Sequence, residues 1–410
     1  MKIISVVGAR PNFMKVAPFI QAINNFNTNN SRYSSGCHPG SVSHCSQLAS
    51  QRLSHITHLL VHTGQHYDDR MSRAFFQTLN IPEADINLGI GSGSQAEQVG
   101  QAMISLEKVF LEEKPDWVVV FGDVNATLSA SVTAKKLHIM VCHVEAGLRS
   151  GDERMPEEIN RLVTDRLSDL LLTPDRLSIQ NLKKEGVPEH KIKFVGNIMI
   201  DTLEANREKA DSLSLDQIVA HNAIPNQLTT DPSESLTNGP FALMTLHRPS
   251  NVDDKQVFEP VMRFLMDEVA LDMPLIWPIH PRSQKQLKAF HLWEKAIGHE
   301  NLFLLHPLGY HDMLKLNMEA KIMLTDSGGL QEECTVLGTP CLTLRWNTER
   351  PITLREHGGA SVLVGNNVDH IRKEYEKTLR LNRKPERPEL WDGKTAERCL
   401  EAIVEWGKLI

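Results

Sequence analysis

Acidic residues follow two apolar runs near the middle of this sequence, and these acids are the first candidates for chemistry. Asp123 stands just past the run at residues 118–121, and Glu145 stands just past the run at 139–142. Continuous apolar runs of this length are typical of buried strands in a parallel sheet. In open α/β sheets, ligands bind beyond the carboxyl ends of the strands. We therefore expect both carboxylates to face a ligand at one edge of a sheet.

Glu157 and Glu158 add two more acids a short distance along the chain, in a turn that leads into a helix. Each acid also has a structural alternative: Asp123 could cap a helix, and Glu157 could complement the positive end of a helix dipole. For a single acid the structural alternative would be favoured. Because all of the acids fall in one strand-end region, the sequence favours a catalytic cluster suited to acid–base chemistry.

Two cations, Arg10 and Lys15, lie beyond the first strand, which we expect at residues 2–7. An apolar pattern predicts a helix from residue 16 to residue 23, so both cations lie near its start. The free N–H groups of a first helical turn attract anions, and Arg and Lys add to that attraction. The motif is not a P-loop, since the Gly-x4-Gly-Lys-Ser/Thr pattern is absent. An ordinary solvated position on the helix stays open for Lys15.

A second candidate anion site lies in the C-terminal half of the chain. The Ser-Gly-Gly sequence at 327–329 follows a predicted strand at 322–325 and opens a helix. Small residues at a strand–helix junction let backbone N–H groups approach a phosphate closely. The alternative is a glycine-permitted turn that only caps the helix.

Strand and helix patterns alternate through both halves of the chain, which predicts an α/β protein. At 410 residues the chain is long enough for two domains with separate cores. We expect two doubly wound, Rossmann-like domains facing a cleft, at residues 1–197 and 198–394, the first carrying the acids. Residues 395–410 are predicted to form a C-terminal helix that packs as a strap. Two polar stretches lack periodicity: 24–58, interpreted as an inserted or mobile surface segment, and 205–238, interpreted as a linker.

Composition and charge argue against several classes of function. The chain is 41% hydrophobic and 23% charged, has no apolar run of membrane-spanning length, and begins with a strand pattern instead of a signal peptide. A net charge of -7 argues against nucleic acid held mainly through its phosphates. Six cysteines without a CxxC pair predict a reduced, cytoplasmic protein. The lack of a membrane-spanning apolar run predicts that it has no membrane partner.

The sequence predicts neither a metal nor a dinucleotide cofactor. His62 and His66 form an i,i+4 pair, but no third ligand lies nearby in the sequence, so we reject a zinc site. The glycine-rich residues 91–96 match a dinucleotide fingerprint only in letters, because no β-branched strand of a first βαβ unit precedes them. We interpret them as the entry to a helix at 95–113.

The motifs of this chain, taken in order, resemble those of the non-hydrolysing UDP-N-acetylglucosamine 2-epimerases over nearly its whole length apart from residues 24–58. The matching segments are GARPNFMKVAP (8–18), HTGQHYD (62–68), GDVNAT (122–127), HVEAGLRS (143–150), MPEEINR (155–161), TLHRPSN (245–251), HPR (280–282), TDSGGLQEE (325–333) and NTERP (347–351). The resemblance implies a GT-B-like pair of Rossmann domains and a homodimer formed by the first domain. It also implies interconversion of UDP-GlcNAc and UDP-ManNAc, without metal or redox cofactor, for cell-surface polysaccharide precursors.

The same resemblance assigns catalytic roles to individual residues. It implies that Asp123, Glu145 and Glu157 are the catalytic carboxylates. His247 would act near the diphosphate leaving group, and Arg161 matches a family arginine beside the catalytic glutamate.

Seven further residues are implied to bind the nucleotide sugar, and they lie in both halves of the chain. They are Arg10, Lys15, Ser327, Gly328, Gly329, Glu333 and Arg350. The first two would bind the diphosphate, and the Ser-Gly-Gly sequence would hold phosphate. Glu333 would hold the uridine ribose, and Arg350 would lie at the nucleotide sugar.

The chain departs from the common family pattern at three places. Asn12 stands where many members have Glu after Arg-Pro, and Ile352 stands where many have Glu. Residues 65–68 read Gln-His-Tyr-Asp, whereas many bacterial members have Gln-His-Arg-Gln at a loop that binds a second, regulatory UDP-GlcNAc.

Four other functions stay open on the sequence. They are a GT-B-type UDP-sugar glycosyltransferase, an epimerase of a related UDP-acetamido sugar, a hydrolysing epimerase, and an inactive nucleotide-sugar sensor. The acid cluster at 123, 145 and 157 weighs against a glycosyltransferase, which needs one base and an acceptor groove. The intact acids and phosphate loop weigh against a sensor.

Overall fold

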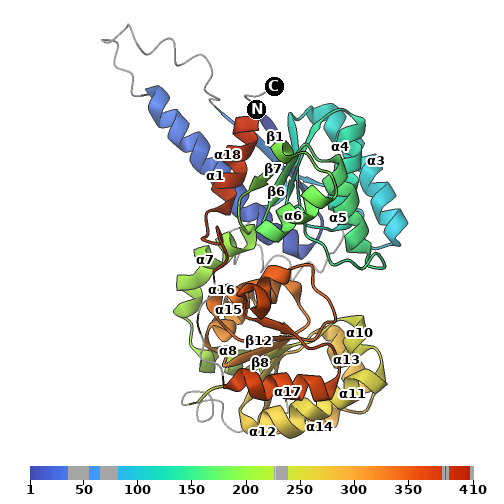
Figure 1. The fold of residues 1–410 in the computed structure, drawn as a ribbon, viewed down its shortest axis with the longest axis vertical. Coiled ribbons are helices and arrows are strands. Elements are labelled where there is room, and N and C mark those ends of the chain that lie inside the picture. Colours follow the sequence, from blue (N-terminus) through green and yellow to red (C-terminus); the bar gives the residue numbers. More distant parts are fainter. Residues whose placement is uncertain are drawn as a thin grey trace. The chain divides into compact units, whose positions relative to one another are not determined.

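Two compact units, each containing one parallel sheet with helices packed on it, make up the structure (Figure 1). It is a computed structural model that describes residues 1–35, 55–64, 82–225, 227, 239–380, 384 and 387–406. Unit 1 comprises Met1–Thr202 and Leu390–Ile410, and unit 2 comprises Leu203–Glu389. The predicted α/β class with two Rossmann-like sheets is confirmed. Unit 1 takes in both the N-terminal segment and the end of the chain.

The sheet of unit 1 has seven strands in the order β3-β2-β1-β4-β5-β6-β7, and its described strand pairs are parallel. The strands are β1 (Lys2–Val7), β2 (Thr57–His62), β3 (Ile86–Asn87), β4 (Trp117–Phe121), β5 (Met140–Val144), β6 (Leu170–Thr173) and β7 (Ile192–Phe194). Every residue of β4 and β6 is buried, as expected for a parallel sheet with both faces covered. The strands predicted at 118–121 and 139–142 are confirmed as β4 and β5, with ends shifted by one or two residues.

The helices of unit 1 surround this sheet. They are α1 (Arg10–Ser35), α3 (Gln95–Glu113), α4 (Asn125–Lys136), α5 (Pro156–Leu167), α6 (Arg176–Lys184), the 3-10 helix η2 (Glu189–Lys191), the first turn of α7 (Ile198–Asp211) and α18 (Thr395–Trp406). The helix predicted at 95–113 is confirmed as α3, and Ser94 and Glu97 form a capping box at its start. Throughout the described ranges, no helix has both the length and the apolar character needed to cross a membrane.

Two helices of unit 1 are longer than the sequence patterns predicted. The helix expected at 16–23 begins at Arg10 and continues to Ser35, so residues 24–35 are not an irregular segment. Residues 24–30 are exposed or partly exposed, which explains why no apolar period marked this part of α1. The remainder of the expected segment, up to residue 54, lies outside the described residues.

The sequence predicts a helix from about residue 162 to residue 168, but the helix in this place, α5, begins at Pro156. Proline has no N–H to lose at the first helical position, so it opens a helix readily. Glu157 and Glu158 consequently lie in the first turn of α5 and not in a preceding loop.

The sheet of unit 2 has six strands in the order β10-β9-β8-β11-β12-β13, and its described pairs are also parallel. The strands are β8 (Ala242–Thr245), β9 (Leu275–Pro278), β10 (Leu302–Leu305), β11 (Ile322–Thr325), β12 (Cys341–Thr343) and β13 (Ser361–Leu363). The sequence predicts the first five of these strands, at residues 242–246, 275–279, 302–305, 322–325 and 340–344. It does not predict β13.

Besides the remainder of α7, the described helices of unit 2 range in length from three residues to twelve. They are α8 (Leu215–Asn222), α10 (Pro249–Val252), α11 (Lys255–Phe264), the π-helix η3 (Leu265–Val269), α12 (Ala270–Asp272), α13 (Pro281–Ala289), α14 (Trp293–Ile297), α15 (Tyr310–Glu319), α16 (Gly328–Leu337), the 3-10 helices η4 (Pro351–Thr353) and η5 (Arg355–His357), and α17 (Val368–Leu379). The linker expected at 205–238 is wrong for its first part, because α7 and α8 occupy most of residues 205–222. Residues 226 and 228–238 lie outside the described residues.

The helix α18 packs against α1 within unit 1, although the two helices come from opposite ends of the chain (Figure 1). Asp201 of α7 accepts hydrogen bonds from the backbone N–H groups of Thr395 at 3.0 Å and Ala396 at 2.7 Å. Burial raises the pKa of Asp201 to about 6. Just before α18, the Trp391 indole N–H donates to the carbonyl oxygen of Pro174 at 2.9 Å. These contacts attach the last helix to unit 1.

Candidate functional site

The strand order reverses once in each sheet, and most of the predicted site residues lie next to these two points. In unit 1, β1 lies beside β4, and in unit 2, β8 lies beside β11. Ligands of doubly wound sheets bind beyond the strand ends at such a point, because the connections on either side leave in opposite directions. Asp123 follows β4, His247 follows β8 and Ser327 follows β11.

A buried ion pair joins Lys15 of α1 to Glu145, the residue after β5. The side chains are only 6% and 2% exposed, so Lys15 does not occupy a solvated helix position. Glu145 has a left-handed backbone with φ of 72°, which is strained for a residue other than glycine. Its Oε1 atom is buried and has no hydrogen-bond partner within the described residues. An unpartnered buried carboxylate oxygen is costly, so both features point to a functional role for Glu145.

Gly122 packs directly against this ion pair. Its backbone is left-handed, with φ of 64°, and a Cβ atom there would lie 2.8 Å from Lys15 Nζ and 3.2 Å from Glu145 Oε2. Glycine is therefore required both for its conformation and for the space it leaves. Asn12 holds the same edge from α1, since its Nδ2 donates to the carbonyl oxygen of Phe121 at 2.7 Å. A glutamate at position 12 would lack that donor.

Asp123 forms an ion pair with Arg161 of α5, whose Nη2 lies 2.8 Å from Asp123 Oδ2. The helix-cap alternative for Asp123 is wrong, because Val124 is the N-cap residue of α4 and no side chain caps that helix. The backbone carbonyl of Asp123 accepts a hydrogen bond from Asn160 Nδ2 at 2.8 Å. Its side chain is 24% exposed, so a ligand can reach the carboxylate while α5 holds it in place.

The two adjacent acids at the start of α5 have different surroundings. Glu158 is buried, pairs with Arg161, and accepts hydrogen bonds from the backbone N–H groups of Ser150 and Gly151 at 3.0 Å each. Glu157 is exposed, and in the first turn of α5 a carboxylate also complements the helix dipole. Glu158 is thus tied into the unit, whereas Glu157 is accessible to a ligand.

In unit 2, the buried carboxylate of Asp326 organises the loop after β8. Its Oδ1 lies 2.9 Å from His247 Nδ1, and its Oδ2 accepts the backbone N–H of Arg248 at 2.8 Å. Burial opposes the charged form, but the hydrogen bonds and charge of His247 hold the pKa of Asp326 below its ordinary value. The contact uses Nδ1 and orients the imidazole, whose side chain is 41% exposed.

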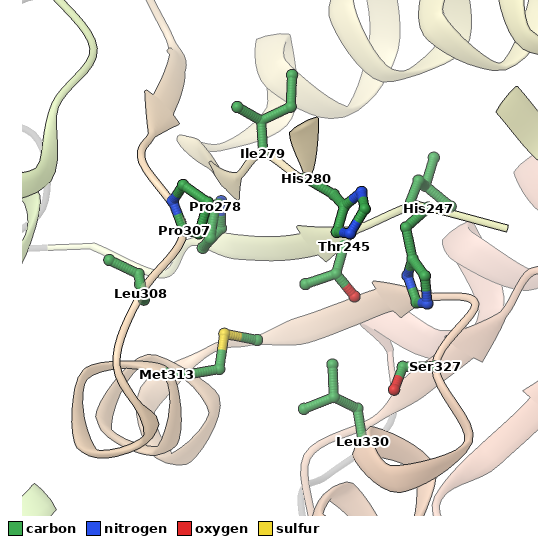
Figure 2. Close-up of a pocket in the computed structure, with 11 residues that line it drawn as sticks. Thr245, His247, Pro278, Ile279, His280, Pro307, Leu308, Met313, Ser327 and Leu330 are labelled. Carbon is green, nitrogen blue, oxygen red and sulfur yellow. The ribbon is translucent and has the colours of Figure 1, made fainter. Parts of the chain in front are cut away.

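An apolar pocket of about 270 Å³ lies beside His247 at the same edge of the unit 2 sheet (Figure 2). Its apolar lining comes from Leu246, Pro278, Ile279, Pro307, Leu308, Met313 and Leu330. The rings of His247 and His280 stand at one side with centroids 5.4 Å apart, and Ser327 also lines the pocket (Figure 2). Apolar walls with a few polar groups at one side suit a planar base attached to a polar or charged group.

The Ser-Gly-Gly sequence forms the start of α16, as the sequence predicts. Ser327 is the N-cap residue, yet its side chain makes no capping hydrogen bond. The first backbone N–H groups of a helix have no partner inside it and attract anions. The junction therefore fits an anion site better than a turn that only caps the helix.

Charged side chains of alternating sign crowd against Gly328. A Cβ atom at Gly328 would lie 2.9 Å from Glu349 Oε1 and 3.1 Å from Arg350 Nη1. Arg350 pairs with Glu349 and, at 2.8 Å, with Glu332 of α16. Arg345 lies 2.7 Å from Glu349. The four charged side chains are buried together, so each guanidinium is fixed beside the helix start by a carboxylate.

Glu333 lies one turn further along α16 and is also buried. Burial raises the pKa of its carboxyl to about 7, and the charge of Glu332 adds to the rise. The polar side chains of Tyr310 and Asn317 work against it. Glu333 therefore changes its charge near neutral pH.

Several site features lie outside the described structure or were missed in the sequence. The side chain of Arg10, at the first position of α1, and the loop at 65–68 are not among the described parts. Asp326 was not predicted as a site residue, although it stands directly after the buried strand β11, in a place like that of Glu145 after β5. His143 and Asp165 were not predicted either, and because they lie inside β5 and α5, no strand end marks them. Within the described ranges, no three His, Cys, Asp or Glu side chains are grouped to hold a metal ion.

Similarity to known proteins runs along the whole chain. A family model described as UDP-N-acetylglucosamine 2-epimerase matches residues 48–404. A UDP-N-acetylglucosamine 2-epimerase from Methanocaldococcus jannaschii is 38% identical over 409 residues, covering 100% of both chains. The crystal structure of the UDP-GlcNAc 2-epimerase from that organism, in complex with UDP-GlcNAc and UDP, is 36% identical, with a TM-score of 0.81 over 99% of this chain and 100% of that one. A UDP-2,3-diacetamido-2,3-dideoxy-D-glucuronate 2-epimerase from Pseudomonas aeruginosa is 36% identical over 376 residues, 90% of each chain.

Proposed function

Because the chain belongs to the UDP-N-acetylglucosamine 2-epimerase family, we propose that it is an isomerase that interconverts UDP-GlcNAc and UDP-ManNAc. The observation that carries this proposal is the pair of carboxylates, Asp123 and Glu145, at the ends of the adjacent strands β4 and β5. Each carboxylate is paired with a cation from a neighbouring helix. Carboxylates in such a place can stabilise developing positive charge and can move a proton.

The reaction poses a specific difficulty at C2 of the sugar. The C2 proton of an acetamido sugar is not adjacent to a carbonyl, so it is barely acidic and direct deprotonation is too costly. Breaking the C1–O bond first lets UDP leave with the bonding electrons and builds positive charge at C1. The C2 proton then becomes acidic, and its loss to a base gives a glycal with a C1–C2 double bond. Protonation from the opposite face and re-addition of UDP at C1 complete the inversion.

The carboxylates of unit 1 divide this work in the proposal. Asp123 and Glu145 stabilise the charge at C1, and one of the acids Asp123, Glu145 or Glu157 takes the C2 proton. Arg161 holds Asp123 in position. Lys15 begins in an ion pair with Glu145 and, with Arg10, is assigned to the departing diphosphate.

We assign the UDP moiety mainly to unit 2. The apolar pocket supports a place for the uracil ring, and the start of α16 at Ser327, Gly328 and Gly329 supports a phosphate site. His247, oriented by Asp326, is assigned to the diphosphate. Glu333 is assigned to the ribose, and Arg350, held by two carboxylates, to the nucleotide sugar.

Proton NMR of UDP-GlcNAc with the purified protein in D2O, without an acceptor, tests the proposal. We expect the manno anomeric signal to appear and deuterium to enter C2 of both epimers. Epimerisation without deuterium uptake would contradict the elimination route. The diacetamido-glucuronate nucleotide, which the Pseudomonas aeruginosa relative is named for, is the second candidate substrate and is tested in parallel.

Two acid variants test the site itself. Asp123→Asn and Glu145→Gln keep shape but remove charge, so each should lower the rate by at least about 100-fold. UDP binding should change much less, because these acids are assigned to the sugar. Glu153→Gln, an exposed acid nearby in the sequence, is the matched control. Near-normal rates in both acid variants would remove the assignment.

We also propose a homodimer formed through unit 1, a cytoplasmic location, and a product used for cell-surface polysaccharide precursors. The family resemblance supports all three. Exposed apolar side chains on helices of unit 1, Ile104 and Leu111 of α3 and Ile159 of α5, further support an interface there. Light scattering should give about twice the 46.2 kDa chain mass, and a monomer at micromolar concentration would contradict the dimer.

A further inference from the structure

A buried histidine, His143, lies behind the acidic edge of unit 1 and has no role in the proposed chemistry. It is the fourth residue of β5 and is fully buried. Its Nε2 lies 2.8 Å from the carbonyl oxygen of Gly122, and its Nδ1 lies 2.6 Å from Oδ1 of Asp165 in α5. Gly122 also donates its N–H to the carbonyl oxygen of Val144 at 3.0 Å. Both backbone polar groups of Gly122 are therefore held by β5.

Both partners of the His143 ring are hydrogen-bond acceptors. A carbonyl oxygen cannot donate, and Asp165 is placed to stay ionised: its Oδ2 accepts the N–H of Gly147 at 3.0 Å and lies 2.7 Å from Arg149 Nη1. A neutral imidazole has one N–H and can donate to only one of two acceptors. With a neutral ring, one of these two short contacts would bring an unprotonated nitrogen against an acceptor oxygen, whereas a proton on each ring nitrogen satisfies both contacts.

We propose that His143 is a positioning residue: a doubly protonated imidazolium, held by Asp165, that fixes Gly122 against the ion pair of Lys15 and Glu145. This inference rests on the proposed function, because it gives His143 a purpose at the acid cluster. Gly122 touches the Lys15–Glu145 pair on one side and is followed by Asp123. A displaced Gly122 would move one carboxylate and loosen the other, and a misplacement of about 1 Å can cost about 100-fold in rate.

The charges around His143 balance, which allows a cation in a fully buried place. Arg149 bridges Asp165 to Glu185 at the end of α6, with distances of 2.7 Å to each carboxylate. On this side of Gly122, the proposed imidazolium of His143 is thus followed by Asp165, Arg149 and Glu185, which alternate in charge. Lys15 and Glu145 form a second balanced pair on the other side. Because each buried charge has a partner of opposite sign, the proton on His143 does not face the cost of an isolated buried cation.

Nitrogen NMR of protein labelled at histidine tests the protonation state directly. The signals of His143 are those that disappear in His143→Gln. We expect both of its ring nitrogens to show the chemical shift of protonated nitrogen, because each one faces a hydrogen-bond acceptor. One unprotonated ring nitrogen near neutral pH would overturn the proposal. This NMR measurement does not require enzyme activity, so its result is independent of whether the proposed function is correct.

Kinetics then test the positioning role. His143→Gln keeps an amide donor that can reach the Gly122 carbonyl, whereas His143→Ala removes it. We expect kcat to fall about 100-fold in the alanine variant and clearly less in the glutamine variant, with the Kd for UDP within about twofold of wild type. His138→Asn is the matched control, since this exposed histidine precedes the same strand and has a left-handed backbone that asparagine tolerates.

Two kinetic outcomes would overturn the positioning role. Equal losses in the glutamine and alanine variants would mean that the donor to Gly122 is not what matters. A parallel loss of UDP binding would indicate general damage to the fold. If the wild-type protein does not epimerise UDP-GlcNAc, the proposed function fails, and the nitrogen shifts still decide the state of His143.

Discussion

Replacing Glu333 with glutamine should stabilise the protein at alkaline pH and leave its stability unchanged in acid. Burial raises the pKa of Glu333 to about 7 from an ordinary value of 4.5. A group whose pKa is higher in the folded state stabilises the fold fully below its unfolded pKa, and this contribution is lost as pH rises through the folded pKa. At roughly 1.4 kcal/mol per pH unit, the contribution lost between pH 4.5 and about 7 is about 3 kcal/mol.

Glutamine has the shape of the protonated carboxyl but cannot ionise. Glu333→Gln should therefore be more stable than wild type by up to about 3 kcal/mol near pH 8, and about equal to it near pH 4. The assay is urea unfolding followed by circular dichroism across this range, with the difference in unfolding free energy plotted against pH. A difference that does not change with pH would refute the reasoning that burial of the charge governs this site.

The neighbouring acid provides a matched control with the opposite expected sign. Glu332 is buried in an ion pair with Arg350 at 2.8 Å, so Glu332→Gln leaves a guanidinium with one fewer charged partner. It should destabilise the protein at neutral pH. If both glutamine variants stabilise the protein, the ion pair of Glu332 with Arg350 does not offset the cost of burying its charge, and the contrast drawn with Glu333 is wrong.

Three further substitutions test the site and the attachment of the last helix. Gly122→Ala should lower the epimerisation rate at least about tenfold, since Gly122 has a left-handed backbone and contacts the buried ion pair. Gly100→Ala in α3 is the control and should not lower the rate, because a Cβ atom there meets open space. In calorimetry, Gly328→Val should weaken UDP binding about tenfold or more, and Gly329→Ala much less, because only the first crowds charged side chains. Asp201→Ala removes the acceptor of two N–H groups in α18, costing about 1–2 kcal/mol, and limited proteolysis should release that helix faster than in wild type.

The strands were predictable from the sequence because burial on both faces leaves long apolar runs. This holds for β4 and β6, in which every residue is buried. Helix ends were harder to predict, because the apolar pattern fades where a helix faces solvent, as in residues 24–30 of α1. The strand β13 was not predicted, although it is no shorter than β12, which was predicted.

The residue types of the candidate site could be predicted, but their partners could not. Lys15 and Glu145 are separated by 130 positions, and only the order of strands β1, β4 and β5 brings them together. The difference between Glu157 and Glu158 depends on where α5 begins, because adjacent helical residues point about 100° apart. His143 lies inside an apolar strand, and nothing in its sequence neighbours indicates that its ring meets one acceptor just after β4 and another in α5.

The contact between α18 and α1 also bears on the order in which the units can form during synthesis. Unit 2 is continuous in sequence, whereas unit 1 is completed by a segment that follows it. A chain leaving the ribosome from its N-terminus can therefore complete unit 2 first, while the surface of α1 that α18 covers remains open. Because α1 carries Lys15, we expect its ion pair with Glu145 to form fully only after translation of α18. Protease treatment of stalled ribosome-bound chains in which a long flexible linker replaces α18, so that unit 2 is clear of the ribosome, should cut α1 while sparing unit 2.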